Sequence, residues 1–309
     1  MSTTLIEAEG LTKRYGRFTA VDHLSLHLDE GEVYGFLGPN GSGKSTAILM
    51  LLGLTEPSEG WARVGGFDPT HQPLQVKRMV GYLPESVGFY NDLTGRENLR
   101  YTASLNSMPR AQAELRIATL LEMVQLSEAA AQLVGQYSRG MRQRLGLADV
   151  LLKEPRLIIL DDPTLGLDPT GVEWLLRVIR ELSSQQGITV FVASHNLHQV
   201  QRICDRVGIM SHGRMVVQGS VDELTSMEEG SHNIEMELHG ATPELMKALE
   251  ALPSVQRCGT SGAYVVLEST AEVRSKAVEA VVAHGVELIG LRSRNRSLED
   301  IYLRYFQEE

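Results

Sequence analysis

The sequence predicts an α/β domain followed by a small ferredoxin-like α+β domain, and three observations support this prediction. Over the first two thirds of the chain, short apolar runs alternate with helical patterns. At 226–232 the chain reads Ser-Met-Glu-Glu-Gly-Ser-His, a polar stretch that is typical of a linker. After it, the predicted strands and helices follow the order β-α-β-β-α-β. We therefore expect domains at 1–225 and 226–309.

The first domain contains apolar runs that suit buried strands. They are apolar on both faces and rich in β-branched residues, as in a parallel sheet covered by helices. The expected strands are Val33–Leu37, Val80–Leu83, Leu157–Leu160, Ile188–Ala193 and Val207–Met210. The expected helices between them are Ser45–Leu54, Arg139–Leu152 and Pro169–Leu182. This alternation predicts an α/β architecture.

The second domain is expected to mix strands and helices in a different order. Its predicted strands are Ile234–Leu238, Val255–Cys258, Ala263–Leu267 and Val286–Leu291, and the middle two form a hairpin. Its predicted helices are Pro243–Ala251, Ala271–Ala283 and Ser297–Phe306. The last helix is an addition to the ferredoxin-like order.

Composition and charge exclude several classes of protein. Of the 309 residues, 42% are hydrophobic and 22% are charged, so the chain can build a core and is not disordered. The net charge of −10 argues against a broad surface for nucleic acid, and we expect no nucleic acid partner. The longest apolar stretch, Ala47–Leu54, is far shorter than the roughly 20 residues that span a bilayer. We therefore expect no segment that crosses a membrane.

Two further features predict a reducing location inside the cell. The N-terminus lacks the basic region and the apolar region of a secretory signal. The two cysteines, Cys204 and Cys258, lie far apart in the sequence and lack CxxC spacing. A disulfide framework or a zinc site is therefore not expected.

A glycine-rich segment carries the strongest chemical signal. Residues 38–45 match the pattern G-x-x-x-x-G-K-[ST] and lie between an expected strand and an expected helix, which is the context that this phosphate-binding loop requires. Backbone N–H groups wrap a β-phosphate, the Lys44 ammonium attracts the β- and γ-phosphates, and the Ser45 hydroxyl is a Mg²⁺ ligand. A glycine-rich turn with a chance lysine is the alternative. The nucleotide-binding residues expected here are Gly38, Pro39, Asn40, Gly41, Ser42, Gly43, Lys44, Ser45 and Thr46.

A pair of acids is expected to complete this phosphate site. The apolar run Leu157–Leu160 ends in Asp161, which is placed to hold Mg²⁺ through water. Asp162 follows directly and is placed to polarise an attacking water. Two acids after a strand can also form a simple helix cap, but their coincidence with a phosphate-binding loop favours the catalytic interpretation.

A second motif identifies the family that the sequence resembles. The stretch Tyr137-Ser-Arg-Gly-Met-Arg-Gln-Arg144 resembles the signature sequence of ABC ATPases, usually written LSGGQ. Ser138 and Gly140 keep its strict positions, and a serine hydroxyl with a glycine N–H at a helix N-terminus suits a γ-phosphate. Tyr137, Arg139 and Met141 depart from the consensus. A serine-capped basic helix is the alternative. Over about residues 4–220, the chain resembles the ATP-binding subunit of an ABC transporter.

The other motifs of that family follow in order. Tyr15 occupies the position of an aromatic ring that stacks on adenine. Glu85, in Gly81-Tyr-Leu-Pro-Glu85, occupies the Q-loop position, where glutamine is commoner. Gly166-Leu-Asp168 matches the D-loop, which contacts the opposite subunit. His195 follows an expected strand and matches the switch histidine that contacts the γ-phosphate.

The resemblance implies ATP hydrolysis with ATP and Mg²⁺ as cofactors. Two copies, or this chain and a homologue, would clamp two ATP molecules between the P-loop of one subunit and the signature of the other. The resemblance assigns catalysis to Asp162, His195 and Lys44, metal binding to Ser45, Asp161 and Glu85, and ATP contacts across the dimer to Ser138 and Gly140. It also adds Tyr15 and Glu85 to the ATP-binding residues.

Asp162 is the departure that matters most, because the family usually has glutamate as general base there. Aspartate is shorter by one methylene, about 1.5 Å. A misplacement near 1 Å can cost about a hundredfold in rate. We expect either slow hydrolysis, or a backbone shift that compensates, or a chain altered to trap ATP.

Short motifs point to the ABC-2 branch of transporters, which includes drug-resistance, sodium and lipid exporters. They are Gly140–Ala148, Leu83-Pro-Glu85 and Ser297–Tyr305. The branch implies an ABC-2 permease with several membrane spans as partner, and a peripheral location on the cytoplasmic face of the cell membrane. The motifs do not name the cargo, because the permease decides it.

A docking groove for the permease is expected around Glu85–Asn98. Phe89, Tyr90 and Leu93 are apolar residues in this turn-rich segment. A local hydrophobic cluster explains them equally well.

Rival functions make different demands on the sequence. An ATP-binding regulatory or assembly factor with slow or no hydrolysis, for example in metalloenzyme maturation, is the main alternative because Asp162 is unusual. An ABC ATPase that acts on DNA ends needs a long coiled coil, and the residues between Glu85 and Tyr137 lack sustained heptads. A ribosome-associated factor typically has two cassettes, whereas this chain has one P-loop.

Overall fold

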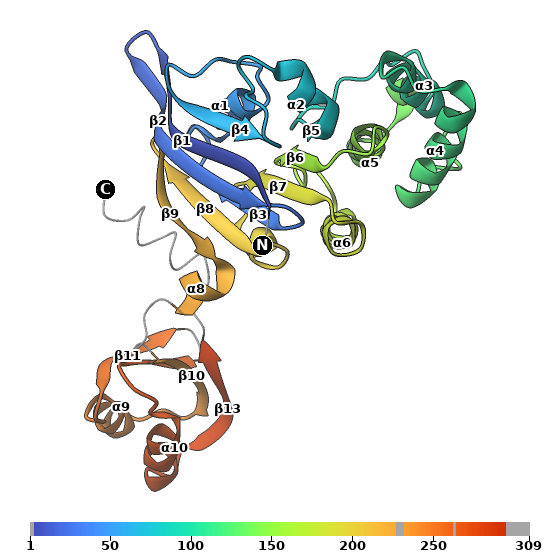
Figure 1. Cartoon of the computed structure of the whole chain (residues 1–309). Coiled ribbons are helices and arrows are strands. Elements are labelled where there is room, and N and C mark those ends of the chain that lie inside the picture. Colours follow the sequence, from blue (N-terminus) through green and yellow to red (C-terminus); the bar gives the residue numbers. More distant parts are fainter. Residues whose placement is uncertain (1–2, 227–231, 262–263, 295–309) are drawn as a thin grey trace. The chain divides into compact units, whose positions relative to one another are not determined.

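The computed structural model describes residues 3–226, 232–261 and 264–294 (Figure 1). The chain separates into two compact units, Met1–Ser220 and Val221–Glu309. Each unit has its own sheet structure and its own cluster of buried side chains.

The larger sheet of the first unit has six strands in the order β5-β6-β7-β3-β8-β9. Neighbouring strands are parallel, except that β9 runs antiparallel to β8. The strands are β3 (Val33–Leu37), β5 (Val80–Leu83), β6 (Leu157–Asp161), β7 (Thr189–Ser194), β8 (Arg206–Ser211) and β9 (Arg214–Ser220). The five strands expected from apolar runs are confirmed, and β3, β6 and β7 are buried along their whole length.

A three-stranded antiparallel sheet, which the search for apolar runs did not find, lies in the same unit. Its strands are β1 (Thr4–Tyr15), β2 (Phe18–Asp29) and β4 (Glu59–Val64). In β2, buried Leu24, Leu26 and Leu28 alternate with exposed Ser25 and His27. Such a strand buries one face only, so its signal is alternation rather than a continuous apolar run.

Some helices of the first unit cover the large sheet, and three others form a group of their own. They are α1 (Lys44–Leu51), α2 (Pro73–Met79), α3 (Gly95–Leu105), α4 (Arg110–Met123), α5 (Arg139–Leu151), α6 (Pro169–Gln186), α7 (Leu197–Gln201) and the 3₁₀ turn η1 (Val134–Gln136). Helices α3, α4 and α5 pack against one another and form a helical subdomain (Figure 1). Helix α1 ends before the predicted Leu54, because Gly53 adopts a left-handed φ of +62° and turns the chain.

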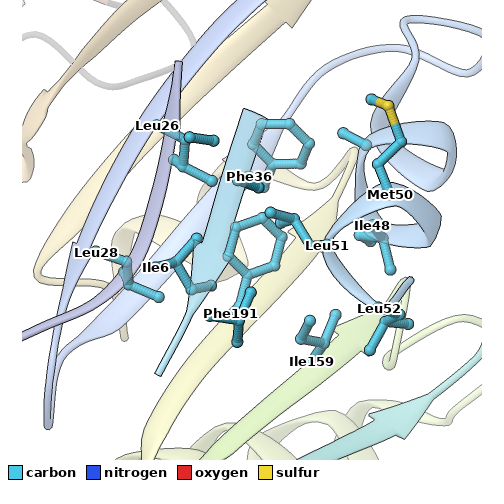
Figure 2. Close-up of a cluster of buried hydrophobic side chains, with 14 of the residues drawn as sticks. Ile6, Leu26, Leu28, Phe36, Ile48, Met50, Leu51, Leu52, Ile159 and Phe191 are labelled. Atoms are coloured by element: carbon cyan, nitrogen blue, oxygen red, sulfur yellow. The ribbon is translucent and has the colours of Figure 1, made fainter. Parts of the chain in front are cut away.

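A cluster of buried hydrophobic side chains holds α1 against the large sheet. Ile48 and Leu51 of α1 pack in one buried cluster with Ile159 of β6 and with two aromatic rings (Figure 2). These rings, Phe36 of β3 and Phe191 of β7, have centroids 5.1 Å apart. Because α1 is packed on these strands, the residues that begin the helix are fixed next to the ends of β3 and β6.

The second unit has the predicted ferredoxin-like order. Its elements are α8 (Val221–Ser226), β10 (His232–His239), α9 (Pro243–Glu250), β11 (Val255–Ser261), β12 (Tyr264–Ser269), α10 (Arg274–Ala283) and β13 (Glu287–Arg294). The sheet order is β11-β12-β10-β13, with every pair antiparallel. Ile234 and Leu267 of the sheet are buried together with Leu245 of α9 and Val281 of α10. The helix expected at Ser297–Phe306 lies outside the described residues.

Within residues 3–226, 232–261 and 264–294, no helix has both the length and the hydrophobicity that crossing a membrane requires. The longest helix there, α6, has 18 residues and carries charged side chains along its exposed side.

Candidate nucleotide-binding and catalytic site

The glycine-rich loop connects β3 to α1 and depends on its glycines. Gly41 and Gly43 have φ values of +84° and +102°, which side-chain-bearing residues rarely adopt. A Cβ at Gly43 would also lie 2.4 Å from the carbonyl oxygen of Ala20 in β2. On its other side, the loop is held by Gly213, whose N–H donates to the Ser42 carbonyl at 3.0 Å. The loop is therefore a tightly packed turn at the N-terminus of a helix, as an anion-binding loop requires.

Lys44 is the first residue of α1, and its side chain turns back into the loop. Its Nζ donates hydrogen bonds to the carbonyl oxygens of Gly38 at 2.8 Å and Pro39 at 3.1 Å. Burial lowers the pKa of this ammonium, whereas the carboxylates of Asp162 and Asp161 raise it. The positive charge of Lys44 is therefore held between the loop and the carboxylates of Asp161 and Asp162.

Ser45 and Asp161 meet at the end of β6. The Ser45 hydroxyl donates to Asp161 Oδ2 at 3.1 Å. Burial raises the pKa of Asp161, the charges of Asp162 and Glu85 raise it further, and the Ser45 hydrogen bond and Lys44 oppose this. Burial and the nearby charge of Asp161 raise the pKa of Tyr82 in β5 to about 12.

These oxygen atoms fit the preferences of Mg²⁺. No group of three or more acid, histidine or cysteine side chains suited to a metal occurs in the described parts of the chain. Mg²⁺ does not need one, because it is usually bound by one or two carboxylates together with substrate phosphates and water. Ser45, Asp161 and Glu85 offer such oxygen atoms, and the neighbouring negative charges of Asp161, Asp162 and Glu85 favour a cation.

Asp162 and His195 are directly paired. The ring Nδ1 of His195 lies 2.8 Å from Asp162 Oδ1, and the backbone N–H of His195 donates to the same oxygen at 3.3 Å. The Asp162 side chain is 13% exposed and the His195 side chain 48%. The Asp162 backbone has a left-handed φ of +44°, a conformation that aspartate adopts more readily than most residues.

The alternative that the two acids form a helix cap does not hold for Asp162. The next helix, α6, begins only at Pro169. Its N-cap is Asp168, whose side chain accepts from the Gly171 N–H at 3.2 Å. The carboxylate of Asp162 is instead paired with His195.

The residues of the signature motif lie at a second cavity, separate from the glycine-rich loop. Ser138 is the N-cap of α5 and accepts from the Met141 N–H at 3.2 Å. Ser138, Gly140 and Asp168 line one open cavity of about 550 Å³, which residues 125–129 also line. The lining contains no residue of the glycine-rich loop.

The remaining predicted residues lie at the edges of the first site. Tyr15 ends β1 and is 51% exposed, with the Lys13 ammonium 5.2 Å from its ring centroid. Its hairpin leads into β2, whose Ala20 packs against Gly43 of the loop. Glu85 is exposed just after β5, close enough to Asp161 to raise its pKa. The loop, the acids, Glu85 and His195 therefore converge, whereas Ser138 and Gly140 belong to the other surface.

Sequence reasoning missed Tyr82, which lies close enough to Asp161 for the charge of that carboxylate to raise the pKa of the phenol. The signal was weak, because tyrosine in a strand usually belongs to a core. Once β5 and β6 are known to be neighbours, the register pairs Tyr82 with Ile159, two residues before Asp161. The alternation of side chains in a strand then puts Tyr82 and Asp161 on one face.

This fold and this site define a P-loop nucleotide-binding ATPase domain, and comparisons with known proteins identify its family. Residues 21–165 match the family described as ABC transporter. The chain is 34% identical over 304 residues to the bacitracin transport ATP-binding protein BcrA of Bacillus licheniformis, covering 98% of this chain and 97% of that protein. It is 39% identical over 239 residues to the daunorubicin/doxorubicin resistance ATP-binding protein DrrA of Streptomyces peucetius, covering 77% and 72%.

Solved structures agree with this assignment. The structure of an ATP-binding subunit of an ABC transporter matches with a TM-score of 0.67 and 31% identity, covering 72% of this chain and 93% of that one. A dimeric ATP-binding cassette bound to ADP and phosphate shares the fold, with a TM-score of 0.65 and 24% identity over 70% of this chain and 99% of that one. The chain belongs to the ABC transporter family. It is an ATP-hydrolysing subunit of the ABC-2 exporter type.

The length of the Asp162 side chain can be tested directly. In Asp162→Glu the carboxylate reaches about 1.5 Å further toward the water. We expect its kcat for ATP hydrolysis to rise by about 10- to 100-fold. Steady-state phosphate release at saturating ATP and Mg²⁺ measures this, with Asp162→Ala as the variant that lacks the carboxylate. If Asp162→Ala hydrolyses ATP as fast as the unmodified protein, Asp162 is not the base.

Proposed function

We propose that two copies of this chain, or this chain and a homologue, bind two Mg·ATP molecules between them and hydrolyse ATP to drive a polytopic ABC-2 permease. One observation carries the proposal. Lys44, Ser45 and Asp161 converge at one site, whereas Ser138 and Gly140 line a separate cavity without any P-loop residue. A nucleotide needs both sets of contacts, so a second subunit has to supply the missing set.

The chemistry follows from the residues at the first site. Lys44 and the loop hold the β- and γ-phosphates, and the charged ammonium stabilises the negative charge that develops during phosphoryl transfer. Asp162 accepts the proton of the attacking water, and His195 fixes the orientation of its carboxylate. Bound Mg²⁺ would be held by Ser45, Asp161 and Glu85 and would neutralise charge on the phosphates.

The other subunit contributes Ser138 and Gly140. The Ser138 hydroxyl and the backbone at the start of α5 face an open cavity, and a helix N-terminus favours a γ-phosphate. Asp168 lines the same cavity and belongs to the loop proposed to contact the opposite subunit. Closure of the dimer on ATP and its release after hydrolysis would then move the permease.

The names of the relatives support export as the direction, and a subunit that drives a permease would lie at the cytoplasmic face of the membrane. They are bacitracin transport and daunorubicin/doxorubicin resistance proteins, which suggests export of a drug-like compound. The first unit would act as motor, and the ferredoxin-like unit as an accessory domain.

The shared site predicts different defects for its two halves. Lys44→Ala removes the charge that holds phosphate, so we expect loss of ATP binding by the isolated chain. Ser138→Arg places a large side chain in the cavity of the signature residues, which contains no residue of the glycine-rich loop. We therefore expect the isolated chain to bind ATP with unchanged affinity. It should nevertheless fail to dimerise with a non-hydrolysable analogue and lose hydrolysis by at least about 100-fold. Equilibrium nucleotide binding, light scattering and phosphate release measure these three properties.

The contrary results are equally clear. Full hydrolysis by Ser138→Arg would exclude a role for the signature. An unmodified protein that binds ATP without any turnover, even with its permease, would favour the regulatory or assembly factor.

The proposed docking segment is exposed and rigidly held. Tyr90 is 51% exposed, and its ring meets that of Tyr101 edge-on at 5.0 Å between centroids. The side chain of Asn98 fixes the backbone of this segment, because it accepts from the Tyr90 N–H at 3.0 Å and donates to the Tyr90 carbonyl at 3.1 Å. Exposed aromatic rings on a fixed backbone suit a helix of a permease.

A charge at Tyr90 tests this docking site. We expect Tyr90→Asp to lose co-purification with the permease, and stimulation by it, while hydrolysis by the isolated chain stays unchanged. Leu74→Asp is the matched control, because Leu74 is 67% exposed on α2 and should tolerate the charge. Normal association of Tyr90→Asp would mean that the tyrosines form only a local cluster.

A further inference from the structure

Arg139 differs from the other two arginines in the first two turns of α5. Arg142 donates to Asn91 Oδ1 at 2.9 Å. The guanidinium of Arg144 lies 4.6 Å from the ring centroid of Trp174. Arg139 is exposed, and within the described parts of the chain it has neither a hydrogen-bond partner nor an ion-pair partner. Its guanidinium therefore keeps its donors available for another molecule.

The side chain of Arg139 lies over the loop that follows β6. A Cβ at Gly166 in this loop would lie 2.5 Å from Cδ and Nε of Arg139 and 2.8 Å from its Cζ. Only a glycine leaves room for the arginine here, and its φ of +77° also favours glycine. Ser138 and Gly140, on either side of Arg139, line the open cavity together with Asp168. The guanidinium is thus held beside the cavity of the signature residues.

The charge of Arg139 is unusual for the place that it occupies. Arg139 is the first residue of α5, and the first turn of this helix contains no acidic residue. A helix N-terminus carries a partial positive charge, so a cation there lowers the stability of the helix. Because this cost is not offset by a carboxylate partner, the positive charges of the arginine and the helix end add up at one surface. Such a surface suits an anion.

The first site has the opposite charge. Asp161, Asp162 and Glu85 are negatively charged there, and Lys44 is the cation that faces the two aspartates. A bound triphosphate adds more negative charge than one lysine can balance. The surface around Arg139 and the loaded first site of a second copy are therefore electrostatically complementary.

We propose that Arg139 is a catalytic residue that acts across the dimer, where its guanidinium donates hydrogen bonds to the γ-phosphate of ATP bound by the partner subunit. This inference rests on the proposed function, which brings the cavity of one copy against the nucleotide of the other. Rotation about the side-chain bonds of Arg139 is enough to turn its donors from Gly166 toward the cavity.

The chemical step shows what this arginine would contribute. The water oxygen forms a bond to the γ-phosphorus, and the bond from this phosphorus to the β–γ bridging oxygen breaks. ADP leaves with that electron pair, and Asp162 takes the proton of the water. Negative charge is spread over the phosphate oxygens during this step. The planar fork of an arginine can donate two hydrogen bonds to such oxygens, which a lysine cannot do with the same geometry.

The test separates the charge of Arg139 from its shape. Arg139→Gln removes the charge, whereas Arg139→Lys keeps the charge and loses the fork. Arg142→Gln is the matched control, because it removes the same charge one turn further along the same helix. ATP binding is measured on the isolated full-length chain, and light scattering measures dimer formation with a non-hydrolysable analogue. The kcat is measured at saturating Mg·ATP and at a protein concentration where the dimer is fully formed. Trapping of Mg·ADP by orthovanadate, which mimics the γ-phosphate in the transition state, is measured alongside.

We expect Arg139→Gln to lower kcat by at least about 100-fold and to lose vanadate trapping, while the dimer still forms. Its affinity for ATP as an isolated chain should be unchanged, and its melting temperature should not fall, because a cation leaves the helix N-terminus. Arg139→Lys should lose less activity than Arg139→Gln. Arg142→Gln should match the unmodified protein in every measurement.

Four results would overturn the inference and leave the proposed function intact. The first is an unchanged kcat in Arg139→Gln. The second is loss of dimer formation in that variant, or a full kcat for each dimer that still forms, which would indicate an ion pair between subunits. The third is weaker ATP binding by the isolated variant, which would place Arg139 at its own nucleotide. The fourth is an equal loss in Arg142→Gln, which would indicate a general effect of charge on α5. If the unmodified protein does not dimerise with the ATP analogue, the proposed function fails, and the inference fails with it.

Discussion

The hydrogen bond from Ser45 to Asp161 is the contact on which the first site depends. It joins two residues 116 positions apart in the sequence at 3.1 Å, one at the start of α1 and one at the end of β6. Neither end can be placed by local structure alone. The buried packing of α1 on β3, β6 and β7 holds them together, and the large hydrophobic residues in that interface supply the free energy. The packing of the hydrophobic core therefore determines how Ser45 and Asp161 are placed relative to each other.

The site carries more negative than positive charge. Asp161, Asp162 and Glu85 are near one another, and Lys44 is the cation that faces the two aspartates. Burial makes this arrangement costly, as the raised pKa of Asp161 indicates. A divalent cation together with a nucleotide would relieve the repulsion, so the site is built to become more stable when loaded.

The parts of the structure that follow from local patterns could be predicted from the sequence. Continuous apolar runs predicted the five parallel strands of the large sheet, because strands buried on both faces carry that signal. The glycine-rich loop was recognisable because its glycines have to adopt left-handed conformations at fixed spacing. The ferredoxin-like order was visible because its strands and helices are short and clearly separated.

The parts that depend on tertiary contacts could not be predicted in this way. Strand β2 alternates buried leucines with exposed polar residues, and it was missed. The pairing of Asp162 with His195 needs the neighbouring ends of β6 and β7, and the proximity of Tyr82 to Asp161 needs the register of β5. The left-handed backbone at Asp162 is also invisible in the sequence, although it gives a physical reason for aspartate at this position.

The most direct measurement is a crystal structure of the chain with Mg²⁺ and a non-hydrolysable ATP analogue. The account predicts that one nucleotide contacts Lys44 of one protomer and Ser138 of the other, with Asp162 facing the terminal phosphate. A nucleotide that is bound by Lys44 while every Ser138 in the assembly lies remote from it would contradict the account.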